Sequence, residues 1–511
     1  MRIELLVFLL SGPLRVLSAT CLGRSGSPNV KVTNQGAESP SSNIGIDSAF
    51  PGKHPHHPPE KEPTGTVYEV LSSDPKFSKL TKALNFVDEV AALLNDTSAM
   101  LTFFATPDHA LRPPERDDYD RDIYSDAFKH DVDQNLFELT DFINLSQAID
   151  LLDRFEQNGA PEDDDNKRKR ILKFILRSIL EYHIVPKDAY DGPTLGHNTT
   201  YATNLTIPHV LDGQPLRLRV SQKFFPVTAI NFFSKIVQPS TKATNGIIHV
   251  VDHPLLPPPP VFQELYLIPH FFSTLTSALQ RSELTEALDL RFVHGKGLQG
   301  ASLVTVFAPT NRAFDKLPQK LKFFLFSPFG ARILKKILQY HIVPDVAVYS
   351  DYLHHKSALE PKCEQVLQVQ NTEPDQSIPW YLRFEDHRHD RRPAEPLSSV
   401  NVTLETLFTN HTLQAHIERT NVTLPIPGPR KPSWIETKVF VNHQLVAVPD
   451  IVALNGAIHV VDALLDPRGP KHGRHEGDHD EENGYDEDSH VQHDEIWGDW
   501  EEWLLQWANE N

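Results

Sequence analysis

The chain contains an internal duplication, and this constrains its fold more than any other feature of the sequence. Three short blocks occur twice, in the same order along the chain. They are FFATP at 103–107 and VFAPT at 306–310, EYHIVP at 181–186 and QYHIVP at 339–344, and NGIIHVVD at 245–252 and NGAIHVVD at 455–462. Matching blocks in matching order predict two domains of like fold rather than one large domain.

Each copy combines helix and strand patterns. Ile333, Ile337 and Tyr340 are spaced at i, i+4 and i+7, which places them on one face of a helix. The runs 247–251 and 457–461 are rich in β-branched residues and predict largely buried strands, each with a histidine at its middle. The Asn-Gly pair before each run predicts a turn with positive φ. The expected class is therefore α+β.

Unequal spacing between the blocks locates two insertions. Ala105 and His183 are 78 positions apart, whereas Ala308 and His341 are 33 apart, so the first copy carries extra residues here. The interval from the second block to the third is longer in the second copy: 118 positions from His341 to His459, against 66 from His183 to His249. Glycosylation signals in the second insertion predict that it lies outside the core. The expected layout is a signal peptide at 1–21, a disordered Pro/Ser/His-rich linker at 22–65, domain 1 at 66–257 with an insertion at about 112–168, a proline linker at 257–260, domain 2 at 261–467 with an insertion at about 373–433, and an acidic tail at 468–511.

Charge and cysteine content exclude several classes of protein. The formal net charge is −19, and 14 acidic residues without a Lys or Arg follow from Glu476 onward. Such a surface cannot neutralise phosphates, so nucleic-acid binding is not expected. Cys21 and Cys363 are the two cysteines, and Cys21 falls at the end of the signal peptide, so stability must come from packed cores rather than disulfides.

The N-terminus and the glycosylation signals predict entry into the secretory pathway. Arg2, the apolar run 5–10 and the small residues Ser18 and Ala19 are typical of a signal peptide. No apolar run is long enough for a transmembrane span, and no lipid-anchor signal is present at the C-terminus. Asn-x-Ser/Thr occurs at seven positions: Asn95, Asn144, Asn198, Asn204, Asn401, Asn410 and Asn421.

The three duplicated blocks resemble the motifs of the fasciclin domain, over about 66–257 and 261–467. The segment 305–314, TVFAPTNRAF, is similar to the first family motif, while the first copy departs from it at Thr106-Pro107-Asp108. The resemblance implies a wedge of strands flanked by helices. It also implies an adhesion or matrix protein without catalytic activity, and the two-copy arrangement resembles fungal secreted or vacuolar members.

The candidate site residues follow from the same motifs. The family's Tyr-His segment, implicated in receptor binding, matches Tyr182-His183 and Tyr340-His341. Because both copies keep these residues, we favour structural hydrogen bonding over partner contact. Further motif residues with the same two readings are His249, Asp252, His459, Asp462 and Asn311. No catalytic residue, metal site or cofactor is expected, and the partner is a protein or polysaccharide of the cell surface or matrix.

Two other functions compete with adhesion. The first is a hydrolase that pairs a histidine with Asp252 or Asp462, although no Gly-x-Ser-x-Gly or His-Glu-x-x-His motif is present. The second is metal buffering by the acidic tail, which carries His472, His475, His479, His490 and His493. Both rank below an adhesion module of the extracellular space, cell wall or vacuole lumen.

The tail carries four of the six tryptophans. Trp500, Trp503, Leu504 and Trp507 fall at i, i+3, i+4 and i+7, so a helix would gather them on one face. Large aromatic side chains are seldom left exposed, so this face needs a partner. The helix either docks on its own domain or serves as a motif for another protein's groove.

Overall fold

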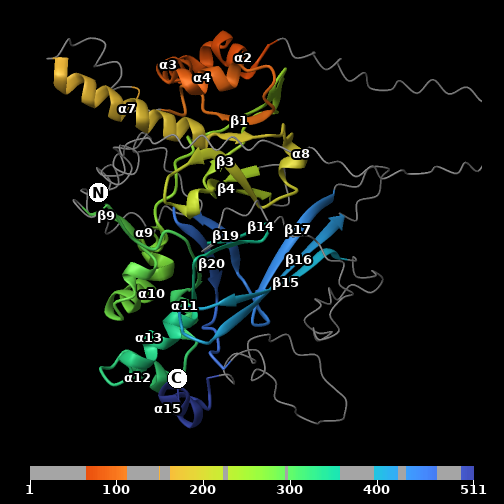
Figure 1. Cartoon of the computed structure of the whole chain (residues 1–511). Coiled ribbons are helices and arrows are strands. Elements are labelled where there is room, and N and C mark those ends of the chain that lie inside the picture. Colours follow the sequence, from red (N-terminus) through yellow and green to blue (C-terminus); the bar gives the residue numbers. More distant parts are fainter. Residues whose placement is uncertain are drawn as a thin grey trace, which may run out of the picture.

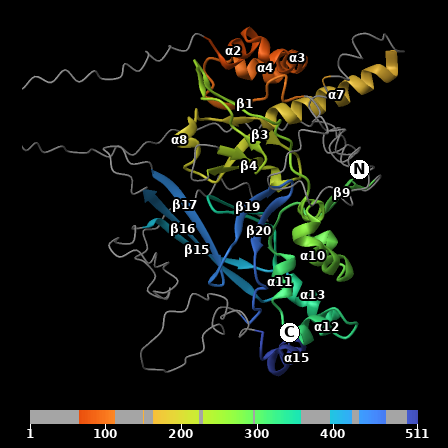
Figure 2. The same ribbon diagram turned by 180° about the vertical axis from the view of Figure 1, so that it is seen from behind.

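The computed structural model describes residues 65–111, 149, 162–222, 228–293, 297–356, 396–423, 433–468 and 497–510 (Figure 1). We call residues 65–257 repeat 1 and residues 261–467 repeat 2. The two repeats lie one above the other, and both views show the helix near the C-terminus at the end of repeat 2 remote from repeat 1 (Figure 2). The expected disordered linker at 22–65 lies outside the described residues except for Gly65. Among the described helices, none is long and apolar enough to cross a bilayer.

Repeat 1 begins with helices that precede its first strand. Its helices are α2 (Val67–Ser73), η1 (Pro75–Phe77), α3 (Ser78–Phe86), α4 (Asp88–Asn95), α7 (Glu162–Tyr182), α8 (Gly192–Leu195) and η2 (Leu211–Gly213). Its strands are β1 (Leu101–Ala105), β2 (Ile184–Pro186), β3 (Thr200–Thr206), β4 (Pro215–Gln222), β5 (Thr228–Ile230), β6 (Ser234–Lys235), β7 (Thr241–Ala243) and β8 (Gly246–Val250).

Repeat 2 follows the same order with additional elements. Its helices are α9 (Val261–Leu267), α10 (Pro269–Arg281), η3 (Thr285–Ala287), α11 (Asn311–Asp315), α12 (Gln319–Leu325) and α13 (Ala331–Tyr340), and α15 (Trp500–Glu510) comes after it. Its strands are β9 (Leu290–Val293), β10 (Gly297–Gly300), β11 (Val304–Pro309), β12 (Ile342–Pro344), β13 (Val346–Tyr349), β14 (Tyr352–His355), β15 (Pro396–Glu405), β16 (Thr412–Thr423), β17 (Ser433–Val441), β18 (Gln444–Leu445), β19 (Val448–Ala453) and β20 (Gly456–Val461).

The duplicated blocks form the same sheet in both repeats. The strand order is β2-β1-β8-β7 in repeat 1 and β12-β11-β20-β19 in repeat 2. In each sheet the central pair is parallel and joins the first block to the third, with Phe103 opposite Ile248 and Val306 opposite Ile458. These strands are buried along their whole length, which explains why they are mainly apolar, with one buried histidine in each of β8 and β20. The expected α+β class and the tandem arrangement are confirmed.

A second antiparallel sheet completes each repeat, with order β3-β4-β5-β6 or β15-β16-β17-β18. This equivalence corrects the position of the insertion expected at 373–433, because β15 and β16 correspond to β3 and β4. Leu404, Leu413 and Ile417 of β15 and β16 are buried in the core of repeat 2, so this segment does not lie outside it. The spacing between the second and third blocks gives the number of extra residues in repeat 2, but it cannot show where within that interval they lie.

A helix forms the end of the expected first insertion. The charged segment there is part of the first turns of α7, which begins at Glu162. α7 has 21 residues, whereas the equivalent helix α13 has 10. Of the rest of the segment 112–168, the structure describes Ile149.

The Asn-Gly pairs close a hairpin, but not through the expected turn with positive φ in both repeats. The loop residues are Thr244-Asn245 and Leu454-Asn455, and the glycine after each loop pairs across the hairpin with Ala243 in repeat 1 and with Ala453 in repeat 2. Neither asparagine nor Gly246 has positive φ, whereas Gly456 has φ of 155°. A Cβ on Gly456 would lie 1.6 Å from the Val304 carbonyl oxygen, so the close parallel strand requires glycine.

The asparagine side chain connects the hairpin to the start of the repeat. Asn455 Oδ1 accepts from the Val261 amide at 2.8 Å, and its Nδ2 donates to the Leu288 and Ala301 carbonyls at 3.1 and 2.7 Å. Asn245 makes the same kind of contacts, accepting from Val67 and donating to the Leu94 and Asp96 carbonyls. Each asparagine is fully buried and satisfies three backbone groups.

The tail helix docks on its own chain. Trp497, Trp500, Leu504 and Trp507 are buried in the core of repeat 2, whereas Glu501 and Glu502 are exposed. The predicted amphipathic helix is therefore present as α15, and of the two readings the self-docked one describes this structure. A separate apolar cluster draws side chains from both repeats, among them Tyr182 and Leu218 from repeat 1 and Leu303 and Tyr349 from repeat 2.

Replacing Asn455 with alanine should lower the free energy of unfolding by about 2–4 kcal/mol, because three buried backbone groups lose their partner. Urea denaturation followed by circular dichroism measures the change. Gln280→Ala, at an exposed position of α10, is the control and should change the free energy by less than about 0.5 kcal/mol. Equal stability of the two variants would contradict the structural role of Asn455.

Candidate functional site: the Tyr-His motifs and the seam between the repeats

The two motif tyrosines are buried at equivalent positions at the ends of α7 and α13. The Tyr182 hydroxyl donates to the Arg217 carbonyl at 3.0 Å and accepts from Asn231 Nδ2 at 2.8 Å. The Tyr340 hydroxyl donates to the Thr412 carbonyl at 3.3 Å and accepts from Asn442 Nδ2 at 2.7 Å. Each tyrosine therefore joins the end of a helix to the second sheet of its own repeat.

The neighbouring histidines bond the end of each helix to the chain that follows the central parallel strand. His183 Nδ1 lies 2.7 Å from the Ile179 carbonyl oxygen, and Nε2 accepts from the Leu255 amide at 2.9 Å. His341 makes the same two contacts with Ile337 and Leu465, at 2.8 and 3.0 Å. A carbonyl at Nδ1 and an amide at Nε2 require the neutral tautomer protonated on Nδ1. Burial lowers the pKa of both His183 and His341 to about 4, so both are neutral at pH 7.

The strand histidines are also directed inward. His249 Nε2 lies 2.8 Å from the Tyr190 carbonyl oxygen, and His459 Nε2 lies 2.9 Å from that of Val348. Their rings stack on Phe104 and Phe307, with centroid separations of 5.6 and 5.3 Å. Burial lowers the pKa of both histidines. Side chains so enclosed cannot reach a partner protein without unfolding of the strand.

The carboxylates of the third block do not pair with these histidines. Asp252 accepts from the Lys235 amide at 2.6 Å and lies 3.0 Å from Nδ1 of His253; its contacts are not with His249. Asp462 is exposed on the chain after β20, whereas His459 is buried and bonded through both ring nitrogens to backbone groups. The geometry therefore gives no support to a histidine–carboxylate hydrolase at these positions.

Asn311 has a structural role that the motif alone did not reveal. Its Oδ1 accepts from the Thr274 amide at 2.8 Å, and its Nδ2 donates to the His270 carbonyl at 2.9 Å, so it holds the start of α10. In repeat 1 the corresponding residue is Asp108, which accepts from the Lys79 amide at 2.9 Å at the start of α3. The departure from the family motif in repeat 1 thus keeps the same helix attachment.

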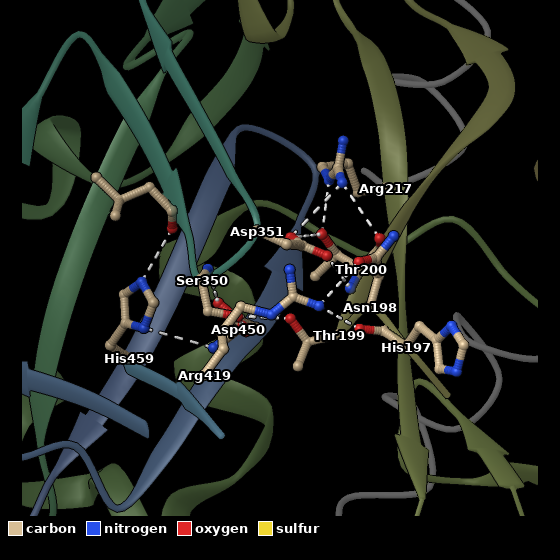
Figure 3. Close-up of polar contacts among 11 residues, drawn as sticks. His197, Asn198, Thr199, Thr200, Arg217, Ser350, Asp351, Arg419, Asp450 and His459 are labelled. Carbon is tan, nitrogen blue, oxygen red and sulfur yellow. Dashed lines mark hydrogen bonds and ion pairs between the residues drawn. The ribbon is translucent and has the colours of Figure 1, made fainter. Parts of the chain in front are cut away.

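A polar cluster joins the two repeats, and Figure 3 shows its side chains converging from β3 and β4 on one side and, on the other, from β19 and the turn between β13 and β14. The Asp351 carboxylate accepts from the Thr200 amide at 2.7 Å and from its hydroxyl at 2.5 Å. Arg217 donates to the Thr200 hydroxyl at 2.8 Å and lies 3.7 Å from Asp351 and 4.3 Å from the Tyr352 ring. Burial raises the pKa of Asp351, and the nearby Arg217 opposes that shift.

Further contacts extend this seam. The hydroxyls of Thr199 and Ser350 lie 2.5 Å apart, and Arg219 donates to the Pro449 carbonyl at 3.1 Å. Arg419 donates to the carbonyl oxygen of His197 and to Asn198 Oδ1 (Figure 3). Most of these residues lie outside the duplicated blocks, so sequence analysis missed them. No signal within one repeat identifies residues whose partners lie in the other.

Ser350, Asp450 and His459 meet at this seam without forming a catalytic triad. The Ser350 hydroxyl donates to the Asp450 carboxylate, and the Asp450 amide, not its carboxylate, contacts His459 Nδ1 at 3.4 Å. A triad requires the histidine to accept from the serine hydroxyl and to donate to the carboxylate. Here neither contact is present, and all three side chains are buried (Figure 3).

The glycosylation signals and the metal alternative complete the sequence-derived sites. Asn95, Asn401, Asn410 and Asn421 are exposed, Asn198 and Asn204 are partly buried, and Asn144 lies outside the described residues. The five tail histidines also lie outside them. In the part of the chain that the structure describes, no group of three His, Cys, Asp or Glu residues is arranged to hold a metal ion.

The stability of the chain should fall as pH decreases from about 6.5 toward 4. An unfolded histidine gains a proton near pH 6.5, whereas folded His183 and His341 resist protonation down to about pH 4. Each of these two histidines should lower the free energy of unfolding by about 2 kcal/mol as the pH falls from 6.5 to 5. Urea denaturation at each pH measures the change. His341→Gln should weaken this dependence by about one proton; a flat profile would contradict the prediction.

Comparisons with known proteins agree with this geometry. A family model described as "Fasciclin domain" matches residues 138–257 and 270–386. A fasciclin-like arabinogalactan protein of Arthroderma benhamiae is 26% identical over 44% of this chain and 55% of that protein. The aurofusarin biosynthesis cluster protein S of Gibberella zeae is 28% identical over 44% of this chain and 46% of that protein. Human periostin is 26% identical over 43% of this chain and 23% of its own length.

The chain spans about half the length of the first two of these relatives. Among solved structures, a FAS1 domain pair from the insect cell adhesion molecule fasciclin I aligns with 77% of this chain and 98% of its own, with 16% identity and a TM-score of 0.27. The family model matches twice, once in each repeat, and both repeats use the motif residues for the same internal contacts. The chain therefore carries two fasciclin domains in tandem.

Proposed function

We propose that this chain is a non-enzymatic glycoprotein of the secretory pathway that serves as an adhesion or matrix- and wall-interaction module. Its place of action is the extracellular space, the cell wall or the vacuole lumen, and its ligand is a protein or a polysaccharide. Related proteins with fasciclin domains are adhesion or matrix proteins, which supports this class of function.

The main support for this proposal is that the motif side chains point into their own repeats. In both repeats the Tyr-His residues are buried and bonded to groups of their own repeat. The same residues in a catalytic site would need access to a substrate and a correctly placed acid–base partner. A binding module has no such requirement, since its ligand contacts can come from groups that the fold leaves on the surface.

The most exposed aromatic side chains of the described residues lie on and beside α12. Phe323 is 71% exposed and Phe329 is 87% exposed, although Phe324 between them packs inward on Trp500. Exposed aromatic rings are typical of interaction surfaces because they offer large apolar area at small entropic cost. In both ribbon views, α12 lies at the end of repeat 2 remote from repeat 1 (Figures 1 and 2).

Three exposed glycosylation signals lie on β15, β16 and the turn between them, at Asn401, Asn410 and Asn421. Carbohydrate at these positions would project from the second sheet without displacing core side chains. This placement supports a glycoprotein.

Replacing Phe323 and Phe329 together with serine should reduce binding of the purified protein to wall or matrix material of its native host at least tenfold. Solid-phase binding measures the affinity, and circular dichroism checks that the melting temperature is kept. Tyr266→Ser, which changes a 53% exposed aromatic residue on α9, is the matched control and should bind like the unmodified protein. Unchanged binding of the double variant would exclude α12 as the contact surface.

Treatment of the protein from its native host with an N-glycosidase should increase its electrophoretic mobility, because the exposed signals carry N-linked glycans. Replacing Asn401, Asn410 and Asn421 with glutamine should remove most of that shift. A protein whose mobility the enzyme does not change would never have been glycosylated, and the secretory assignment would then fail.

A further inference from the structure

Helix α15 occupies a groove on repeat 2 formed by α12, α13 and the loop between β15 and β16. Trp500 stacks on Phe324 with ring centroids 5.4 Å apart, and Trp507 packs on Phe408 at 5.2 Å. Leu504, between them on the same face, is fully buried. Both ribbon views place α15 beside α12 and α13 (Figures 1 and 2).

The groove also recognises the end of the helix. Lys336 on α13 is a buried lysine, and its Nζ donates to the Ala508 carbonyl oxygen at 2.5 Å. Carbonyls in the last turn of a helix have no partner within it and lie at its negative end, so a lysine ammonium satisfies both needs. The groove thus combines an apolar floor for residues spaced i, i+4 and i+7 with a cation for the helix C-terminus, which is how helix-binding grooves select their ligands.

Repeat 1 uses the equivalent loop to hold a different neighbour. Between β3 and β4, the Leu211 amide donates to the Ser302 carbonyl of repeat 2 at 2.9 Å, and Asp212 lies 3.4 Å from His354. In repeat 2 the loop between β15 and β16 holds α15 through Phe408 and His411. In each repeat, therefore, this loop contacts a segment that lies later in the chain.

The connection to α15 is much longer than its position requires. Arg468, before the connection, lies 4.0 Å from Asp499 and from the Trp503 ring, so the chain returns to where it left. The 28 residues 469–496 separate these points. A chain of that length can reach about 90–100 Å when extended, which is enough to place α15 on another molecule.

We propose that this groove is a binding site for an amphipathic tryptophan helix, and that α15 of a second copy of the chain can take the place of the chain's own α15. Exchange joins the groove of one copy to the tail of the next without forming any new contact. This inference does not depend on the ligand proposed above. A tether of this length keeps the chain's own helix near the groove at an effective concentration of about millimolar, so exchange requires copies crowded on a surface or matrix.

Complementation between two full-length variants tests the exchange. W500A/W507A keeps the groove but has a defective tail, whereas F324A/F408A keeps the tail but has a defective groove. Each variant alone, and the unmodified protein in dilute solution, should have the mass of a monomer by light scattering. Their mixture should form a heterodimer whose fraction rises with concentration, because neither partner has a competing tail in its own groove.

Two controls make the result decisive. Mixing W500A/W507A with a variant that carries all four changes should give monomers only. Should F324A/F408A fail to fold, judged by circular dichroism, a labelled peptide of residues 496–511 replaces it as the tail donor; it should bind W500A/W507A saturably and at least tenfold more tightly than the same peptide with W500A. Folded variants that stay monomeric when mixed, or a peptide that does not bind saturably, would overturn the proposal.

Discussion

Each repeat depends on one neutral imidazole held between a helix and the chain that follows the central parallel strand. His183 and His341 accept a backbone amide on one nitrogen and face a helix carbonyl with the other. Without that bridge, the last helical turn and the segment after β8 or β20 would each lose a buried hydrogen bond, at a cost of about 1–3 kcal/mol per unsatisfied group. The adjacent tyrosine bonds the same helix end to the second sheet. Two consecutive residues therefore hold together the helix, the second sheet and the segment after the central strand.

This arrangement explains why the most recognisable motif says little about the ligand. A residue repeated in both copies is repeated because the fold needs it, and here every Tyr-His side chain is bonded inside its own repeat. Surface groups are freer to differ between the copies. Phe323 and Phe329 illustrate this, since the insertion in repeat 1 occupies the corresponding part of the chain.

Sequence reasoning reached the parts of the fold that rest on local pattern or on duplication. The central strands, the helix ending at Tyr340 and the apolar face of α15 were predictable from the spacing of their residues. Contacts between segments far apart in the chain were not. Asn231 and Asn442, which hold the tyrosines, both lie in the turn before β6 or β18 with positive φ, but the sequences around them differ. Asp351 acquires its role from Thr200 and Arg217 of the other repeat, and no periodicity encodes that.

The apolar cluster shared by the two repeats has a mechanical consequence. Leu218 and Tyr182 pack in the same cluster as Leu303 and Tyr349, and the Thr200–Asp351 contacts lie beside them. Pulling the repeats apart must expose that cluster and break those contacts together, because neither half keeps a complete core of its own there. Under tension the two repeats would therefore separate from each other in one step, unlike two domains that are joined by a flexible linker alone.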